Sequence, residues 1–130
     1  MTEGLDTSVV VRLLIGAPSD QAAVAQRMIE KATRGSLVVS DLVIGETYFA
    51  LRHHYDVPHR RAITALATLV ADPRIRCTGV AAQVLANMPD REAGAGLMDR
   101  LIHGGYESDG VRLLTFDRAA ARLTDARLLG

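Results

Sequence analysis

The chain alternates between short runs of Val, Leu and Ile and longer stretches in which apolar residues recur at helical spacing. The short apolar runs predict strands, one ending at Gly4-Leu5-Asp6 and the others over Ser36–Val39, Ile75–Thr78 and Val111–Thr115. The helical spacing predicts helices over Ser8–Ile15, Asp20–Thr33, Asp41–His54, His59–Val70, Val80–Asn87, Gly96–His103 and Asp117–Leu123. Because each strand is followed by a helix or a helix pair, right-handed crossovers would make the sheet parallel and cover both its faces. The predicted fold class is therefore α/β, with three α/β/α layers around a short parallel sheet of about four strands.

Length and composition favour one globular domain. The chain has 130 residues, of which 48% are apolar and 23% charged, the usual globular mix rather than a disordered one. Lys and Arg number 15, and so do Asp and Glu, so the formal charge is zero. That balance excludes a nucleic-acid binder that depends on bulk positive charge. We expect a single domain over residues 1–130.

The sequence contains no pattern typical of a signal peptide, a membrane span, a disulfide framework or a cysteine-built zinc site. The apolar run Val9–Ile15 is interrupted by Arg12 and preceded by acidic residues, which is the wrong flank for a signal peptide. No run reaches the ~20 apolar residues of a membrane span. A single cysteine, Cys77, excludes an intramolecular disulfide framework and a cysteine-built zinc site. We expect a soluble, cytoplasmic protein without a membrane partner, in which Cys77 acts as a small apolar residue.

Acidic residues stand where a parallel sheet usually places its ligands. Such sites form beyond the carboxyl ends of the strands. Asp6 follows the first predicted strand, Asp117 follows the last, and Asp99 lies in a largely apolar helix. Each of the three also has a purely structural explanation, since Asp is favoured at helix N-termini.

Glu46 is a fourth candidate. Leu42, Glu46, Phe49 and His53 share one stripe of a predicted helix, and this stripe indicates a buried face. Burying a carboxylate costs several kcal/mol unless it is paired or bound to a cation. A salt bridge to Arg52 or to another nearby Arg is as good an explanation of Glu46 as a functional site.

Taken together, the four acids indicate a cation. Carboxylates that converge repel one another, and Mg²⁺ or Mn²⁺ relieves that repulsion with oxygen ligands. Setting the four aside leaves eleven acidic residues against fifteen basic ones, so the remaining surface is positive and suited to phosphate.

The order of these residues resembles that of PIN-domain ribonucleases, and most of all the VapC-type toxins of bacterial toxin–antitoxin pairs. The resemblance spans Leu5 to about Leu123. It is carried by Asp6-Thr7-Ser8, Ser40, Glu46, Asp99 within Gly94–Ile102, and Thr115-Phe116-Asp117.

The resemblance implies a PIN-like fold and hydrolysis of RNA phosphodiester bonds with Mg²⁺, or Mn²⁺, leaving a 5′-phosphate and a 3′-hydroxyl. It implies four catalytic and metal-binding acids: Asp6, Glu46, Asp99 and Asp117. Asp6 and Asp99 would be the firmest ligands, and Glu46 and Asp117 would complete the site directly or through water.

Three further residues receive roles from the resemblance. Ser8 and Thr115 would hydrogen-bond the carboxylates. Arg12 would contact substrate phosphate, although a solvated arginine on an amphipathic helix explains it equally well.

The sequence departs from the family pattern in three places. Only Leu5 stands where an apolar run usually precedes the first Asp, so either the first strand is short or the true start lies upstream. Gly96 occupies a position that is often acidic, which favours one tightly held ion over two. The segment His103–Glu107 is looser than the usual alanine-rich helix.

Partners also follow from the resemblance. It implies an RNA substrate, a cognate antitoxin whose tail covers the acidic site, and a toxin–antitoxin hetero-oligomer. It further implies a homodimer, packed through the helices around Phe49, Leu51 and Ala62–Leu69.

Other functions are weaker or remain open. A phosphoacceptor receiver domain needs a Lys after its last strand, whereas the only lysine is Lys31. A haloacid-dehalogenase-like phosphatase needs a second acid where Ser8 stands. A catalytically inactive PIN-like binding or scaffold module remains the alternative. The four histidines are expected at the surface or an interface rather than as metal ligands: His53, His54, His59 and His103.

Overall fold

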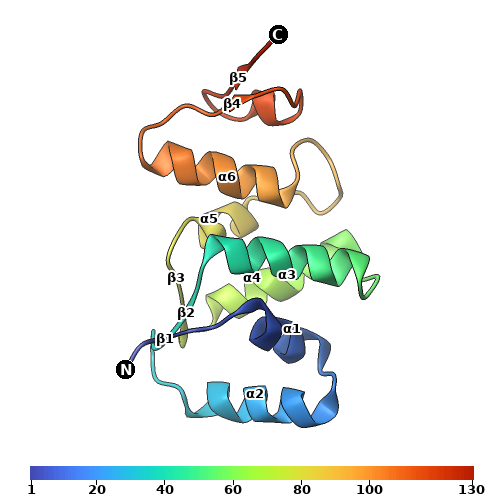
Figure 1. The fold of residues 1–130 in the computed structure, drawn as a ribbon, viewed down its shortest axis with the longest axis vertical. Helices are drawn as coiled ribbons and strands as arrows, with labels where there is room; N and C mark the ends of the chain where they lie inside the picture. The colour runs from blue at the N-terminus through green and yellow to red at the C-terminus, as the bar shows by residue number, and fades with distance from the viewer.

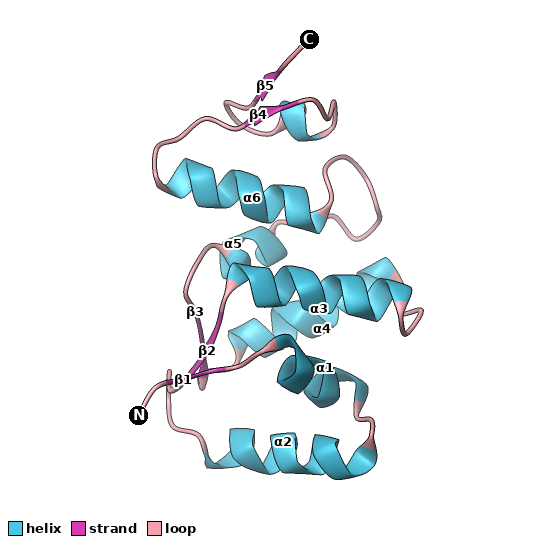
Figure 2. Cartoon of the chain, viewed as in Figure 1, coloured by secondary structure: helices cyan, strands magenta, loops and turns pink.

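The structure is a computed structural model that describes residues 1–130. Its helices are α1 (Thr7–Ile15), α2 (Ser19–Lys31), α3 (Asp41–His53), α4 (His59–Ala71), α5 (Ala81–Ala86), α6 (Leu97–Ser108) and the 3₁₀ helix η1 (Ala120–Arg122). Its strands are β1 (Glu3–Gly4), β2 (Leu37–Val39), β3 (Ile75–Cys77), β4 (Leu114–Thr115) and β5 (Arg127–Leu128). Figures 1 and 2 show them stacked along one long axis.

Three parallel strands form the central sheet in the order β1-β2-β3. Val38 in the middle strand lies opposite Gly4 on one side and Arg76 on the other. The pair α1 and α2 connects β1 to β2, and the pair α3 and α4 connects β2 to β3. The predicted three-layer α/β/α class is confirmed, and the predicted elements of this region begin and end close to the observed ones.

The last predicted strand lies outside this sheet. Of Val111–Thr115, only Leu114–Thr115 is strand, and it pairs in parallel with β5, which the sequence pattern missed. The short η1 replaces most of the helix predicted over Asp117–Leu123. We call residues 111–130 the carboxy-terminal unit. It lies beyond α6, at the opposite end of the molecule from α2 (Figure 1).

The end of α6 explains why β4 begins late. Gly110 has φ +70°, and its N–H donates to Glu107 while the N–H of Val111 donates to Tyr106. These two bonds close a helix in the way that a glycine in the left-handed conformation allows. Val111 therefore belongs to the helix end and not to the strand.

Helix α6 also runs past the predicted end at His103. Gly104 sits inside it because a Cβ there would lie 2.9 Å from Cγ2 of Val80, on the segment that starts α5. The glycine is required by close packing of α5 and α6, and it does not interrupt the helix.

The hydrophobic core lies between the sheet and the helices. It contains Val10, Val39, Ile44, Leu51, Leu66 and Leu97 among its most buried side chains. Leu51, Ala62 and Leu66 are at most 1% exposed, so these three side chains cannot form the expected dimer contact, and the dimer itself stays a prediction. Of that expected surface, Phe49 is exposed.

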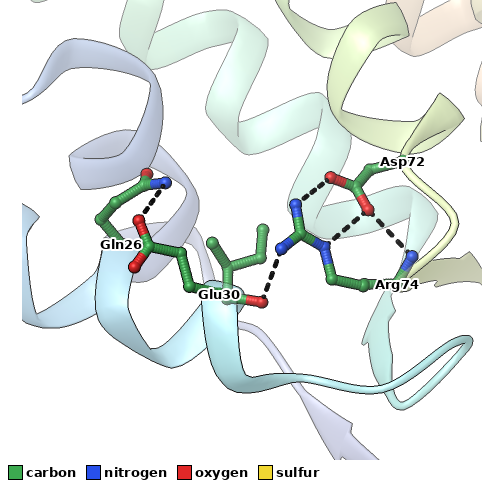
Figure 3. Close-up of polar contacts among 5 residues, drawn as sticks. Gln26, Glu30, Asp72 and Arg74 are labelled. Atoms are coloured by element: carbon green, nitrogen blue, oxygen red, sulfur yellow. Dashed lines mark hydrogen bonds and ion pairs between the residues drawn. The ribbon is translucent and has the colours of Figure 1, made fainter.

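A charged contact ties β3 to α2 (Figure 3). Asp72 accepts hydrogen bonds from the backbone N–H and the guanidinium of Arg74, at 2.7–3.0 Å. The same guanidinium donates to the Ile29 carbonyl near the end of α2, at 3.0 Å. A separate bond between Gln26 and Glu30 runs along α2.

Helices long and apolar enough to cross a bilayer are absent from the structure.

Candidate functional site

Asp6 begins the site at the carboxyl end of β1. It is the N-cap of α1, and its Oδ1 accepts from the Val9 N–H at 3.3 Å and from the Ser8 hydroxyl at 2.5 Å. The Ser8 hydroxyl, followed by the Val9 N–H, holds the pKa of this carboxyl below its usual value. Asp6 is therefore ionised and solvent-exposed, and the structure contains the expected hydrogen bond from the Ser8 hydroxyl to its carboxylate.

Glu46 reaches the same region from α3. Its Oε1 accepts a hydrogen bond of 2.8 Å from the hydroxyl of Thr7, the residue that follows Asp6. The alternative salt bridge to Arg52 or another nearby Arg is wrong, because Arg52 pairs with Glu92 and Glu46 takes part in neither salt bridge of the chain. The sequence did not identify Thr7 as a residue of the candidate site. Its position between Asp6 and Ser8 could have indicated that role.

The face of α3 that carries Glu46 is exposed and not buried. Leu42 is 65% exposed and Phe49 56%, whereas Ile44, Thr47 and Leu51 form the buried side. Both faces of this helix are largely apolar, so periodicity alone did not distinguish them. Glu46 therefore needs no buried counter-charge.

Asp99 lies in the first turn of α6 and is partly exposed. The neighbouring Met98 side chain packs on Gly45, the residue before Glu46. This contact brings the first turn of α6 against the middle of α3. Asp99 takes part in neither salt bridge of the chain, so its carboxylate is not neutralised by an arginine.

Asp117 lies on the carboxy-terminal unit, two residues after β4. Its Oδ1 accepts from the Ala120 N–H at 2.8 Å, as a cap of the following turn. The Thr115 hydroxyl accepts from the backbone N–H of Asp117 at 3.0 Å. The predicted bond from Thr115 to a site carboxylate is thus replaced by a bond to the backbone of Asp117.

The four acids do not form one cluster within a single chain. No three His, Cys, Asp or Glu side chains lie close enough to hold one ion together. Thr7 links the segment of Asp6 to Glu46, and α6 brings Asp99 against α3, while Asp117 is carried away by the carboxy-terminal unit.

Arg12 is engaged inside the protein. Its Nε donates to Gln21 of α2, and its Nη1 donates to the Ser8 carbonyl at 3.0 Å. The bond to Gln21 joins α1 to α2, whereas the bond to the Ser8 carbonyl lies within α1. The role of Arg12 toward substrate phosphate stays a prediction.

Two of the histidines are buried, contrary to expectation. His59 contacts the Tyr48 hydroxyl at 2.6 Å and the Pro89 carbonyl at 3.0 Å. His103 contacts the Thr124 carbonyl at 2.7 Å and so fastens the carboxy-terminal unit to α6. Both are structural, since both ring nitrogens of His59 and Nε2 of His103 contact partners inside the chain.

Comparison with known proteins gives the family. Residues 5–126 match the family described as the PIN domain. The chain belongs to the PIN-domain family. The match covers every acid of the candidate site and includes β4 and η1, and it ends at Ala126, just before β5.

Two solved structures are similar to this PIN-domain chain. Their sequence identities are low, so the similarity is one of fold alone. VapC20 from Mycobacterium tuberculosis, a sarcin-ricin-loop-cleaving toxin, is 20% identical with a TM-score of 0.46, over 97% of this chain and 99% of that one. VapBC2 from Rickettsia felis, bound to a DNA fragment from its promoter, is 14% identical with a TM-score of 0.41, over 99% of this chain and 98% of that one. None of the curated proteins matches.

Proposed function

We propose that this PIN-domain protein is a metal-dependent ribonuclease and the toxin of a type II toxin–antitoxin pair, acting in the cytoplasm. Family membership over residues 5–126 supports a nuclease. The toxin role rests on the sequence resemblance to VapC-type proteins.

One observation carries the catalytic part of the proposal. The Thr7 hydroxyl connects the Asp6 segment to Glu46, so two acids from different helices converge at the carboxyl end of the sheet. Neither acid is in a salt bridge with an arginine or lysine. Exposed carboxylates held together without a counter-charge are suited to a hard divalent cation.

The donor chemistry fits Mg²⁺ or Mn²⁺, although one chain does not bring three ligands together. Asp6, Glu46 and Asp99 would hold the ion, with Asp117 as the fourth acid. When bound, such an ion lowers the pKa of a water molecule and offsets charge on the phosphate. Ser8 keeps Asp6 ionised, and Thr7 fixes the direction of Glu46.

The proposed partners follow from this role. RNA is the substrate, and an antitoxin encoded with this protein would cover the acidic site and restrain it. The active assembly would be a homodimer that joins the antitoxin in a hetero-oligomer.

The alternative is a catalytically inactive PIN-like binding or scaffold module. It is favoured by the absence of a three-acid group in the single chain.

RNA cleavage with supplied Mg²⁺ or Mn²⁺ tests the proposal. Wild type should cleave RNA, and Asp6→Ala should lose at least ~10²-fold of that activity, since it removes a charge that acts on the metal. Asp90→Ala is the matched control, because Asp90 is exposed and lies on the loop between α5 and α6. Equal cleavage by wild type and Asp6→Ala would mean that the acids are not the site.

A further inference from the structure

Helix α3 presents an exposed aromatic ring next to the candidate site. Phe49 is 56% exposed and stands three residues beyond Glu46, which puts the two side chains on the same face of the helix. The centroid of its ring lies 4.4 Å from that of His53 and 6.1 Å from that of His54. Both histidines are exposed. Three aromatic rings therefore gather in solvent at the carboxyl end of α3.

The exposed stripe of α3 that carries Glu46 and Phe49 runs between two other helices. On one side Glu46 bonds Thr7 of α1, and on the other α6 packs against α3 through Met98, which lies on Gly45. Figure 1 shows α3 between α1 and α6. These two helices carry further acids of the candidate site. A substrate strand bound at the acids reaches Phe49 by following α3 toward its carboxyl end.

A cavity of about 450 Å³ opens beside the same rings. It lies between the carboxyl half of α3, the start of α4 and the loop of residues 88–96 that precedes α6. His53 lines it together with Tyr48, Arg52 and Arg91, so one histidine belongs to both the ring cluster and the cavity wall. Ligand pockets usually measure ~300–1,000 Å³, which is enough for one nucleotide.

Buried contacts hold the wall of this cavity in place. His59 is 8% exposed and contacts the Tyr48 hydroxyl at 2.6 Å and the Pro89 carbonyl of the loop at 3.0 Å. Arg52 of α3 pairs with Glu92 of the same loop. The loop is therefore fixed to α3 and α4 in the free protein. A cavity that is already formed loses little conformational freedom when a ligand enters it.

Positive charge surrounds the rings and the cavity. Residues 49–61 contain three Arg and three His against one Asp, although the whole chain is neutral. Arg60 and Arg61 begin α4 and are exposed, and Arg91 lines the cavity. None of these three arginines is in a salt bridge. Basic side chains without a carboxylate partner, next to exposed aromatic rings, are suited to a single nucleic-acid strand.

We propose that Phe49 and His53 form a stacking platform for bases of single-stranded RNA, and that the adjoining cavity receives one nucleotide of the same strand. The inference rests on the proposed function, because the acids would cleave the strand that the platform holds. Unpaired RNA bases are typically recognised by stacking on aromatic side chains. A double helix keeps its bases inside, so the platform restricts the protein to unpaired segments of RNA.

A second copy of the chain is the other occupant that would cover Phe49, as the dimer expected around this residue implies. In a symmetric dimer the same surface lies on both sides of the contact. Two surfaces rich in Arg and His would then face each other, and like charges brought together oppose association. Phosphate carries the opposite charge. The charge distribution therefore favours RNA at this surface.

Binding of short strands in the presence of EDTA tests the platform apart from cleavage. The probes are a labelled oligouridylate of about eight nucleotides and an abasic ribose-phosphate chain of the same length. Phe49→Ala should weaken binding of oligouridylate roughly 10-fold, the usual effect of losing one base–aromatic stack, and should leave the abasic chain unaffected. Tyr106→Ala is the matched control, because Tyr106 is 47% exposed on α6, outside the platform and the cavity.

A fluorescent variant reports the stacking directly. The chain contains no tryptophan, so Phe49→Trp introduces a single indole and keeps an aromatic surface. It should bind oligouridylate as wild type does, and its emission should be quenched over the same concentration range. Tyr106→Trp should show no quenching. Emission of Phe49→Trp that changes with protein concentration and not with RNA would mean that a second copy covers the ring, which overturns the inference.

The cavity has its own test in Arg91. Arg91→Ala should weaken oligouridylate and the abasic chain alike, because it removes a phosphate contact, and should reduce the slope of log affinity against log salt by ~0.7. Arg34→Ala is the control, since Arg34 is exposed and precedes β2, at the opposite end of the sheet from the acids. Equal loss of affinity in both variants would mean that the cavity is not part of the binding site.

Cleavage then separates this inference from the proposed function. With Mg²⁺ supplied, Phe49→Ala should raise KM for an unpaired RNA roughly 10-fold and leave kcat nearly unchanged, because the platform binds substrate away from the reacting bond. Binding that depends on Phe49, without cleavage by wild type, would count against the nuclease alone. Cleavage by wild type, with Phe49→Ala binding oligouridylate as tightly, would overturn the platform alone. Absence of oligouridylate binding by wild type also overturns the platform.

Discussion

The hydroxyl of Thr7 lies 2.8 Å from Oε1 of Glu46 and joins the first turn of α1 to the middle of α3. Thr7 follows directly on Asp6, whose own carboxylate is held by Ser8 and Val9. One hydroxyl thus fixes the position of one acid relative to the other. Hydrogen bonds of this kind hold the ligands of a metal site in the orientation that binding requires.

Replacing Thr7 with Val should therefore weaken the site without unfolding the protein. Val keeps the branched shape and removes the donor to Glu46. We expect Mg²⁺ affinity and RNA cleavage to fall ~10-fold, the usual effect of losing a hydrogen bond to a ligand. Isothermal titration with Mg²⁺ and a cleavage assay measure the two effects. Thr7→Ser restores the hydroxyl and should restore both, whereas a purely structural role for the threonine would leave Thr7→Ser and Thr7→Val alike.

Metal binding should raise the melting temperature. A ligand that binds only the folded state stabilises it by ~2.7 kcal/mol at 100 times its Kd, which corresponds to roughly 10 °C for a domain of this size. Thermal unfolding with and without millimolar Mg²⁺ or Mn²⁺ measures the rise. Asp6→Asn is the control and should show a much smaller shift. If wild type itself shows no shift, the scaffold alternative is correct.

Asp99→Asn should preserve or slightly raise the stability of the metal-free protein and should lower its affinity for Mg²⁺. The substitution removes a charge near Glu46, so the metal-free protein should melt at the same temperature or slightly higher, since repulsion among acids is relieved. Mg²⁺ affinity should fall because a neutral amide is a poorer ligand than a carboxylate. A large drop in the melting temperature without metal would show that Asp99 is structural.

Thr47 offers a test of the core beneath the site. Its side chain is fully buried on α3, and its hydroxyl has no hydrogen-bond partner. A buried hydroxyl without a partner is costly, so Thr47→Val should stabilise the protein by ~1 kcal/mol. Thr47→Ser keeps the hydroxyl and loses the methyl group, and it should destabilise by a similar amount. Urea unfolding of the three proteins measures both, and a Val variant less stable than wild type would contradict this explanation.

Local signals in the sequence predicted the first part of the fold well. Ser40 follows an apolar run and Asp6 follows Leu5, each precedes a helical stretch, and both cap helices in the structure. The physical reason is that a cap depends on a few adjacent residues, which the sequence displays directly.

The pairing of strands that lie far apart in the chain was harder to predict from the sequence. Apolar content predicted a strand over Val111–Thr115, but it could not say that β4 would pair with β5 and not with β1. Strand pairing depends on contacts between residues far apart in the chain, and two open edges can satisfy the same backbone groups in more than one way. For that reason the four acids were identified by order and type, while their gathering into one site could not be derived.

Acid should weaken the contact between Asp72, at the end of α4, and Arg74, which directly precedes β3. Hydrogen bonds from the Arg74 guanidinium, and then from its backbone N–H, lower the pKa of Asp72 from 3.8 to about 2 (Figure 3). Because the folded state holds the carboxylate more strongly than the unfolded state, this contribution is complete above about pH 4 and is lost as the pH falls toward 2.

Asp72→Asn should therefore lower the melting temperature by a few degrees at pH 7, and the difference from wild type should shrink steadily below pH 4. Melting curves between pH 2 and pH 7 measure it. Asp90→Asn, at an exposed position, is the control and should stay close to wild type throughout. A difference between Asp72→Asn and wild type that is the same at pH 2.5 and pH 7 would show that the side chain acts through packing, because only an ionised carboxylate can lose its contribution on protonation.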